Sequence, residues 1–273
     1  MNAPWYVLAA WSAFAGTHLL LGLPPWRDRL ARALGEQRFV AVFSAVAAAM
    51  LAVLGAVVAI FGGDGPAGAA LGSDPAWRLP LGFAAWLGLV LATAGLLNYM
   101  RSPMALFRTE LRPVAGIERI TRHAFFVGLA LFAIAHALLA STAAVALYFA
   151  GFALLSLAGA VLQDRKLLRR YGDAYAGYLA VTSLLPFVAI ARGRQRLRRG
   201  EGLLRRLLIA AVVAALLAAM HPLWAAYHGA PLAGVIAFGG VFASARRWRL
   251  AQRIACATRV AAIAPLPPGE GLG

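Results

Sequence analysis

Residues 123–163 read HAFFVGLALFAIAHALLASTAAVALYFAGFALLSLAGAVLQ and contain no Asp, Glu, Lys or Arg. A helix that crosses a membrane needs about 20 apolar residues, so this run is long enough for two spans. Ser141 and Thr142 lie between its two apolar halves and leave room only for a tight turn. The stretch therefore predicts an antiparallel transmembrane hairpin that ends at Asp164.

The rest of the chain repeats this apolar character. Hydrophobic residues make up 62% of the sequence and charged residues 13%, whereas about a quarter of a soluble domain is charged. Further uncharged runs cover residues 1–26, 39–61, 79–100 and 207–245. We predict an all-α, polytopic transmembrane helix bundle of six helices, or seven if the last run crosses twice. The predicted organisation is a transmembrane domain over 1–230, an additional helix within 231–254 and a flexible tail over 255–273.

The distribution of charge predicts the orientation of the bundle. The net charge is +16, but the basic residues cluster at the ends of the apolar runs, in segments 27–38, 101–122 and 163–202. This pattern indicates contact with a lipid bilayer and argues against nucleic acid as a partner. Under the positive-inside rule these segments are cytoplasmic, which places the N-terminus in the periplasm if the membrane is a bacterial inner membrane.

The segment that follows Asp164 changes to charged and aromatic residues. Tyr171, Tyr175 and Tyr178 recur at the spacing of one helical face, while Gly172 interrupts the pattern and Asp173 is a suitable N-cap. We predict a short cytoplasmic helix here. Two interpretations remain open: a helix lying in the lipid headgroup region, or a cover over a cofactor.

Histidine is the residue on which any metal site must rely, because the chain has a single cysteine, Cys256. Five histidines occur, at positions 18, 123, 136, 221 and 228. His123 and His136 cannot bind one ion together, because thirteen helical residues separate them by about 20 Å. A membrane iron with two imidazole ligands would then pair His18 with either of them, and depth along the helices leaves that choice open. His221 and His228 flank an outer turn where water is available, so we expect solvated side chains there and not metal ligands.

Several motifs together resemble the NnrU family, which is similar to zeta-carotene isomerase and more distantly to isoprenylcysteine and methanethiol methyltransferases. The matching pieces are Gly16-Thr17-His18-Leu19, Gly35-Glu36-Gln37-Arg38-Phe39, Arg122-His123 with Gly128, Ala135-His136, Asp164-Arg165-Lys166, Tyr171-Gly172 and Pro186. They extend over residues 1 to about 230.

The resemblance implies heme b held by His18 and His136. It further implies that Arg122, His123 and Asp164 belong to the same cofactor region, where Arg122 and His123 would pair with Asp164 or with a heme propionate. The expected function is nitric oxide or nitrite metabolism in denitrification, or cis–trans isomerisation of a polyene. The expected partner is a small lipophilic substrate or a membrane reductase.

Two other functions are alternatives to these. The first is an S-adenosylmethionine-dependent membrane methyltransferase, but such enzymes usually have Arg-His-Pro, a tyrosine two residues later and a glutamate. This chain instead has Ala124, Phe126 and Asp164, and a phenylalanine cannot supply the missing hydroxyl. The second is a non-catalytic protein that assists a membrane reductase.

Overall fold

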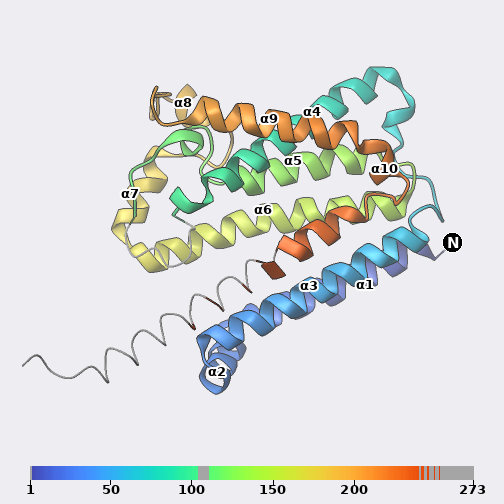
Figure 1. The fold of residues 1–273 in the computed structure, drawn as a ribbon, viewed down its shortest axis with the longest axis horizontal. Helices are drawn as coiled ribbons and strands as arrows, with labels where there is room; N and C mark the ends of the chain where they lie inside the picture. The colour runs from blue at the N-terminus through green and yellow to red at the C-terminus, as the bar shows by residue number, and fades with distance from the viewer. Residues whose placement is uncertain are drawn as a thin grey trace, which may run out of the picture. The chain divides into compact units, whose positions relative to one another are not determined.

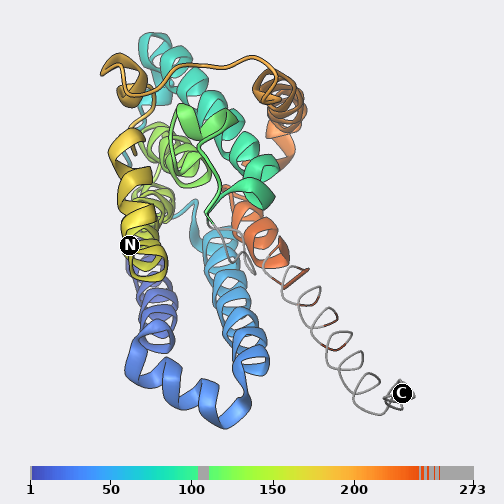
Figure 2. The ribbon, with the colours of Figure 1, turned by 90° about the vertical axis from the view of Figure 1, so that its left-hand side faces the viewer.

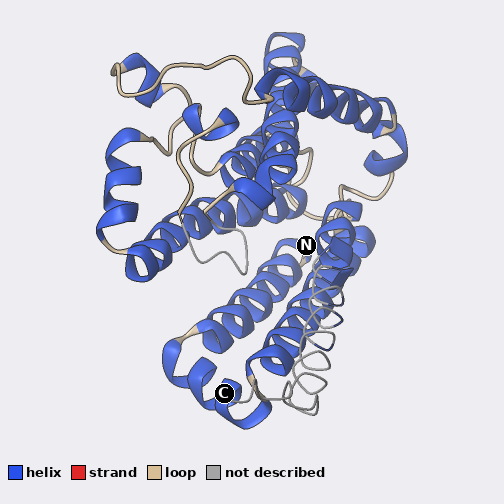
Figure 3. Ribbon diagram, turned by 60° about the vertical axis from the view of Figure 1, so that its left-hand side comes forward, coloured by secondary structure: helices blue, strands red, loops and turns tan. Residues whose placement is uncertain are grey.

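The computed structural model describes residues 2–103 and 111–239, together with 241, 242, 245, 249 and 252. Among these residues the regular structure is helical, with an isolated bridge between Ala67 and Thr142 and no strand (Figure 3). The prediction of an all-α helix bundle is therefore confirmed. The predicted tail over 255–273 lies outside the described residues, and so does most of 243–254.

The chain divides into two compact units. The first unit contains Met1–Leu8 and Ile60–Gly229, and the second contains Ala9–Ala59 and Ala230–Gly273. The helix pair near the N-terminus thus groups with the described residues that follow Gly229. The sequence-based boundaries at 230 and 254 stay a prediction.

The second unit is built on a helical hairpin. It comprises most of α1 (Ala3–Gly22), then α2 (Pro24–Leu34) and α3 (Glu36–Phe61). Figures 1 and 2 show α1 alongside α3, with α2 connecting their ends. Two prolines open α2, where the missing N–H groups are not needed, and the helix axis bends by 71° there. Residues 231–239 are helical, and Ala233 packs closely on Gly55 of α3.

The first unit contains four long helices and several short ones. In chain order these are η1 (Leu71–Ser73), α4 (Pro75–Asn98), η2 (Tyr99–Arg101), η3 (Gly116–Arg119), α5 (Ala124–Leu139), α6 (Ala143–Tyr171), α7 (Asp173–Val181), α8 (Val188–Ala191), α9 (Leu203–Ala219) and α10 (His221–Ala225). The helices α4, α5, α6 and α9 run side by side (Figure 1).

The predicted hairpin is confirmed in α5 and α6. Thr142 caps α6, because its hydroxyl accepts a hydrogen bond from the Val145 amide at 3.4 Å. The same hydroxyl donates to the Gly62 carbonyl at 2.6 Å. Three residues, Ala140, Ser141 and Thr142, thus connect the helices in a tight turn, as the sequence predicted.

Small residues let α4 and α5 approach until their backbones nearly touch. An added Cβ at Gly128 would lie 2.3 Å from the Ala92 nitrogen, and one at Gly95 would lie 2.4 Å from the Phe125 nitrogen. Glycine at such positions allows the backbones of membrane helices to pack closely. This contact fixes the N-terminal end of α5, where Arg122 and His123 lie.

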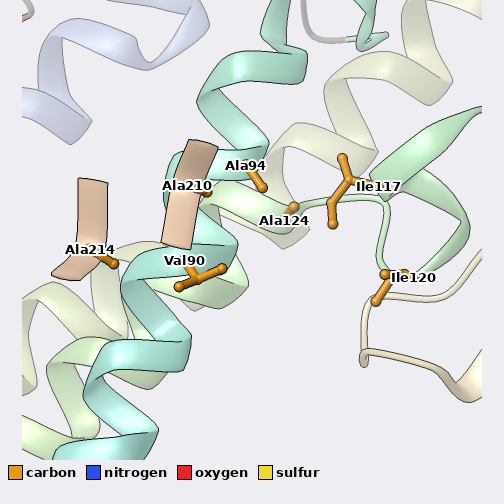
Figure 4. Close-up of a cluster of buried hydrophobic side chains, with 7 residues drawn as sticks. All are labelled: Val90, Ala94, Ile117, Ile120, Ala124, Ala210 and Ala214. Carbon is orange, nitrogen blue, oxygen red and sulfur yellow. The ribbon is translucent and has the colours of Figure 1, made fainter. Parts of the chain in front are cut away.

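The opposite face of α4 packs against α9. Figure 4 shows the shared apolar cluster, whose buried members are Val90, Ala94, Ile117, Ile120, Ala124, Ala210 and Ala214. The two α9 residues of this cluster, Ala210 and Ala214, are fully buried where α9 packs on α4. The cluster also anchors the loop through η3 that leads into α5.

Three described helices are long and apolar enough to cross a membrane: Glu36–Phe61, Pro75–Arg101 and Ala143–Tyr171. The bent pair at the N-terminus would be a fourth, and α5 is a shorter apolar helix. The protein is therefore a membrane protein. The count of six or seven spans stays a prediction.

Candidate functional site

Asp164 is the centre of a buried group of polar side chains, the Asp164 cluster, which comprises Arg122, His123, Asp164 and Tyr175. Arg122 donates to Asp164 through Nε at 2.9 Å and Nη2 at 2.7 Å, and both side chains are 15% exposed. The Arg122 amide also donates to the Ser183 carbonyl at 3.0 Å. This two-bonded ion pair joins the start of α5 to the last turns of α6.

His123 contacts the same carboxylate. Its Nε2 lies 2.7 Å from Asp164 Oδ1, and the side chain is only 1% exposed. The ring edge meets Phe126, with centroids 5.9 Å apart. Of the two pairings expected for Arg122 and His123, the structure contains the one with Asp164.

Tyr175 completes the cluster from α7. Its hydroxyl donates to Asp164 Oδ1 at 2.7 Å, and its ring stacks on Tyr178 at 5.4 Å. Burial and the hydrogen bond to Asp164 raise the pKa of Tyr175 well above its ordinary value, so the hydroxyl keeps its proton. Gly172 has a positive φ of 52° and separates α6 from α7, which turns Tyr175 back onto α6.

A second polar network fastens the loop beside this cluster. Arg119 donates to Glu201 through Nε at 2.8 Å and Nη2 at 2.6 Å, and to the Gln195 side chain at 2.6 Å. Glu201 also accepts from the Gly116 amide at 2.6 Å. The hydrogen bond from Arg119 lowers the pKa of Glu201. These contacts hold η3 against the segment before α9.

His136 lies on α5, within the first unit, and one ring nitrogen is already bound. Its Nδ1 lies 2.9 Å from the Phe132 carbonyl of the same helix. A carbonyl only accepts, so Nδ1 carries the proton and Nε2 has the lone pair. The rings of Phe132 and Phe149 flank it at 4.1 and 4.8 Å. Metal-binding histidines have this arrangement, because a bond at one nitrogen orients the other toward the metal.

His18 lies in the second unit and is held by rings only. It stacks on Phe14 at 5.3 Å and lies 4.7 Å from Phe43, while its buried Nδ1 has no hydrogen-bond partner among the described residues. A buried imidazole nitrogen without a partner is unfavourable unless a ligand uses it. Each ring, taken alone, fits the role of an axial iron ligand.

The other two histidines lie near the C-terminal end of the first unit. His221, at the start of α10, is exposed, and its ring lies 6.3 Å from that of His136. The His228 ring packs against Gly63. No group of three or more His, Cys, Asp or Glu side chains suited to a metal ion occurs in the described part of the chain.

The sequence did not reveal every residue of this region. The resemblance suggested the meeting of Arg122, His123 and Asp164, but Tyr175 was left either on a helix in the headgroup region or on a cover over a cofactor. It also gave no indication that His221 approaches His136. The spacing of Tyr171, Tyr175 and Tyr178 was the only available signal for Tyr175, and the break at Gly172 obscured it.

The helices and the Asp164 cluster define an all-α membrane protein in which Arg122, His123 and Asp164 are paired with one another. The family model described as NnrU protein matches residues 6–229, and the chain belongs to this family.

Two curated relatives share a shorter segment with the chain. It is 42% identical over 82 residues to 15-cis-zeta-carotene isomerase, chloroplastic, of Zea mays, which covers 30% of this chain and 22% of the maize protein. It is 40% identical over 80 residues to the protein of the same description from Arabidopsis thaliana, covering 29% and 22%. The matched segments thus span about a fifth of each relative. No solved structure matches the chain.

Proposed function

We propose that this protein binds heme b in a bacterial inner membrane, with its N-terminus in the periplasm, and acts in cis–trans isomerisation of a polyene. The observation that carries the proposal is the His136 ring, whose Nδ1 bond to the Phe132 carbonyl leaves Nε2 for a metal. The likeness to the isomerases of Zea mays and Arabidopsis thaliana supplies the substrate class.

His136 and His18 would hold the heme, which when bound supplies a redox-active iron. At His136, the protein itself orients the imidazole ring and surrounds it with apolar side chains. Phe132 and Phe149 pack on the ring and exclude water from it, while the helix carbonyl fixes the protonated nitrogen. The pairing of His136 with His18 rests on the family resemblance.

His123 differs from His136 in which ring nitrogen is bound. Its Nε2 is bound to Asp164 at 2.7 Å, so an iron at that atom would break the hydrogen bond, and only Nδ1 would be left for a metal. In His136 it is Nδ1 that is bound, to the carbonyl of Phe132 in the same helix. The choice of His136 over His123 as the ligand contributed by α5 rests on the family resemblance.

The methyl-transfer alternative receives little support from the cluster. Arg122 and His123 are both engaged by Asp164, and Phe126 packs against Gly159 with no hydroxyl at that position. Calorimetry with S-adenosylmethionine tests this alternative directly. An assisting role in denitrification would instead appear as co-purification with a membrane reductase.

Visible spectroscopy of the full chain, purified from cells with ample heme, tests the proposal. We expect a Soret band and low-spin bands on reduction, and loss of the low-spin spectrum in His136→Ala and in His18→Ala. His221→Ala is the matched control, because its ring lies beside His136 but has no assigned ligand role. An unchanged spectrum in His136→Ala with a loss in His221→Ala would reassign the ligand. Absence of heme from the wild-type protein would refute the proposal.

Activity requires a separate measurement. The reduced, heme-loaded protein in lipid vesicles should convert 15-cis-zeta-carotene to another geometric isomer, resolved by chromatography. The His136→Ala variant, in which the normal heme ligation should be lost, should give the background rate. Heme binding without conversion of this polyene would retain the cofactor assignment and remove the isomerase assignment.

A further inference from the structure

His123 has one ring nitrogen that the protein leaves without a partner. Nε2 is bound to Asp164, whereas Nδ1 is buried and has no hydrogen-bond partner among the described residues. The side chain is 1% exposed, so bulk water does not solvate this atom. A buried polar atom without a hydrogen bond destabilises the folded state, so a ligand that satisfies it would be bound favourably.

The neighbours of Asp164 determine which nitrogen of His123 carries the proton. Asp164 also accepts hydrogen bonds from Arg122 and from Tyr175, so it is ionised and has no proton to donate. The His123 Nε2 atom must therefore be the donor to Asp164. In the neutral ring, Nδ1 is consequently a lone-pair acceptor.

The carboxylate also changes the character of Nδ1. A carboxylate bound to one imidazole nitrogen fixes the ring orientation and makes the other nitrogen a better base. Arg122 already balances the charge of Asp164, so a neutral His123 leaves the cluster without net charge. A neutral ligand with a hydrogen-bond donor therefore suits this site better than an anion.

We propose that His123 Nδ1 binds the hydroxyl group of a lipophilic alcohol or phenol, whose apolar body packs toward Phe126. A hydroxyl is the group that fits both charge states of the ring, because it can donate to the neutral imidazole and accept from the imidazolium. The ring edge of Phe126 lies beside His123 with centroids 5.9 Å apart, which supplies an apolar contact at the same place.

This ligand is distinct from the substrate of the proposed isomerase. A hydrocarbon polyene has no O–H group and would leave Nδ1 without a partner. The hydroxyl site therefore goes beyond the proposed function, and it involves neither His18 nor His136. It can be tested on the protein with or without heme.

The test uses the full chain, labelled with 15N in its histidines and embedded in lipid nanodiscs. The probes are 4-decylphenol and 4-decylanisole, which share one apolar body and differ only in that the phenol has a hydroxyl. We expect the nitrogen resonance of His123 Nδ1 to shift saturably with the phenol and to stay unchanged with the anisole. The resonance that disappears in His123→Gln provides the assignment.

Two variants separate the role of the carboxylate from general effects on folding. Asp164→Asn should weaken phenol binding about two- to tenfold, as expected for one weakened hydrogen bond. Tyr227→Phe changes an exposed tyrosine outside the Asp164 cluster and should bind the phenol as the wild type does. The wild-type spectrum alone decides whether His123 Nδ1 binds the phenol hydroxyl, even if Asp164→Asn fails to fold.

Three results would overturn the proposal. An unliganded His123 with its proton on Nδ1 would contradict the tautomer on which the site depends. Equal shifts with both probes would show a bilayer effect and no hydroxyl recognition. No response to the phenol at saturating concentration would show that Nδ1 is satisfied by water or by the protein.

Discussion

Replacing Gly128 by alanine tests the close contact between α4 and α5. The added Cβ would lie 2.3 Å from the Ala92 nitrogen and 2.5 Å from the Gly88 oxygen. Both are backbone atoms, so no side-chain rotation relieves the overlap. The helices must separate by about 1 Å to restore van der Waals distances, and a gap of that size forfeits about a quarter to a half of each contact along the interface.

The expected loss of stability follows from two opposing effects. Overpacking at a tight site destabilises by about 1–3 kcal/mol, whereas alanine favours a helix over glycine by up to about 1 kcal/mol. We therefore expect Gly128→Ala to lower the free energy of unfolding by about 1–2 kcal/mol. Unfolding by sodium dodecyl sulfate in mixed micelles, followed by circular dichroism, measures this value.

Gly82 on α4 provides the matched control, because a Cβ there meets no atom within 4 Å. Gly82→Ala should leave stability unchanged or raise it by up to about 1 kcal/mol. Gly88→Ala should resemble Gly128→Ala, since its Cβ would lie 2.7 Å from the Gly128 oxygen. The double variant should lower the free energy of unfolding by less than the sum of the two single variants, because one separation of the helices accommodates both methyl groups. A Gly128→Ala protein as stable as Gly82→Ala would refute the close-contact explanation.

Two further predictions concern the polar networks. Glu201→Gln should destabilise by about 2 kcal/mol at pH 7, because it replaces one carboxylate partner of Arg119, whose side chain is 8% exposed. The lowered pKa of Glu201 stabilises the folded state above the ordinary value of 4.5, and this contribution is lost as pH falls through the folded-state pKa. The stability difference between wild type and Glu201→Gln should thus shrink below about pH 4.5 in detergent unfolding curves, and a constant difference down to pH 3 would contradict it. Tyr175→Phe should cost about 1 kcal/mol by removing one hydrogen bond to Asp164, while the exposed Tyr227→Phe should change nothing; equal stabilities for the two variants would argue against that bond.

The sequence predicted the hairpin because its evidence is local. An uncharged run, a two-residue turn and a charged end at Asp164 define two helices without reference to distant residues. The same run also positions Arg122 and His123 at one end of α5 and Asp164 near the matching end of α6. Antiparallel packing then brings them together, which agrees with the pairing that the family resemblance implied.

Other contacts depend on information that no local pattern contains. Arg119 and Glu201 are 82 residues apart, and each lies among many similar charged residues. Their pairing follows from how η3 and the start of α9 are placed by the apolar cluster around Ala94. Tyr175 illustrates a subtler limit, because the turn at Gly172 determines which way α7 points.

The two α5 histidines have opposite environments, and this contrast suggests a division of roles. His123 is held by a carboxylate that two other residues also bind, so its ring cannot turn without breaking the Asp164 cluster. Among the described residues, His136 contacts its own helix carbonyl and neighbouring rings, and its hydrogen bond uses Nδ1. A ligand at His136 Nε2 would leave the Asp164 cluster intact. A ligand at His123 Nδ1 would add to the cluster without disturbing Nε2. The proposed metal on His136 and the proposed hydroxyl on His123 would therefore not compete for the same hydrogen bond.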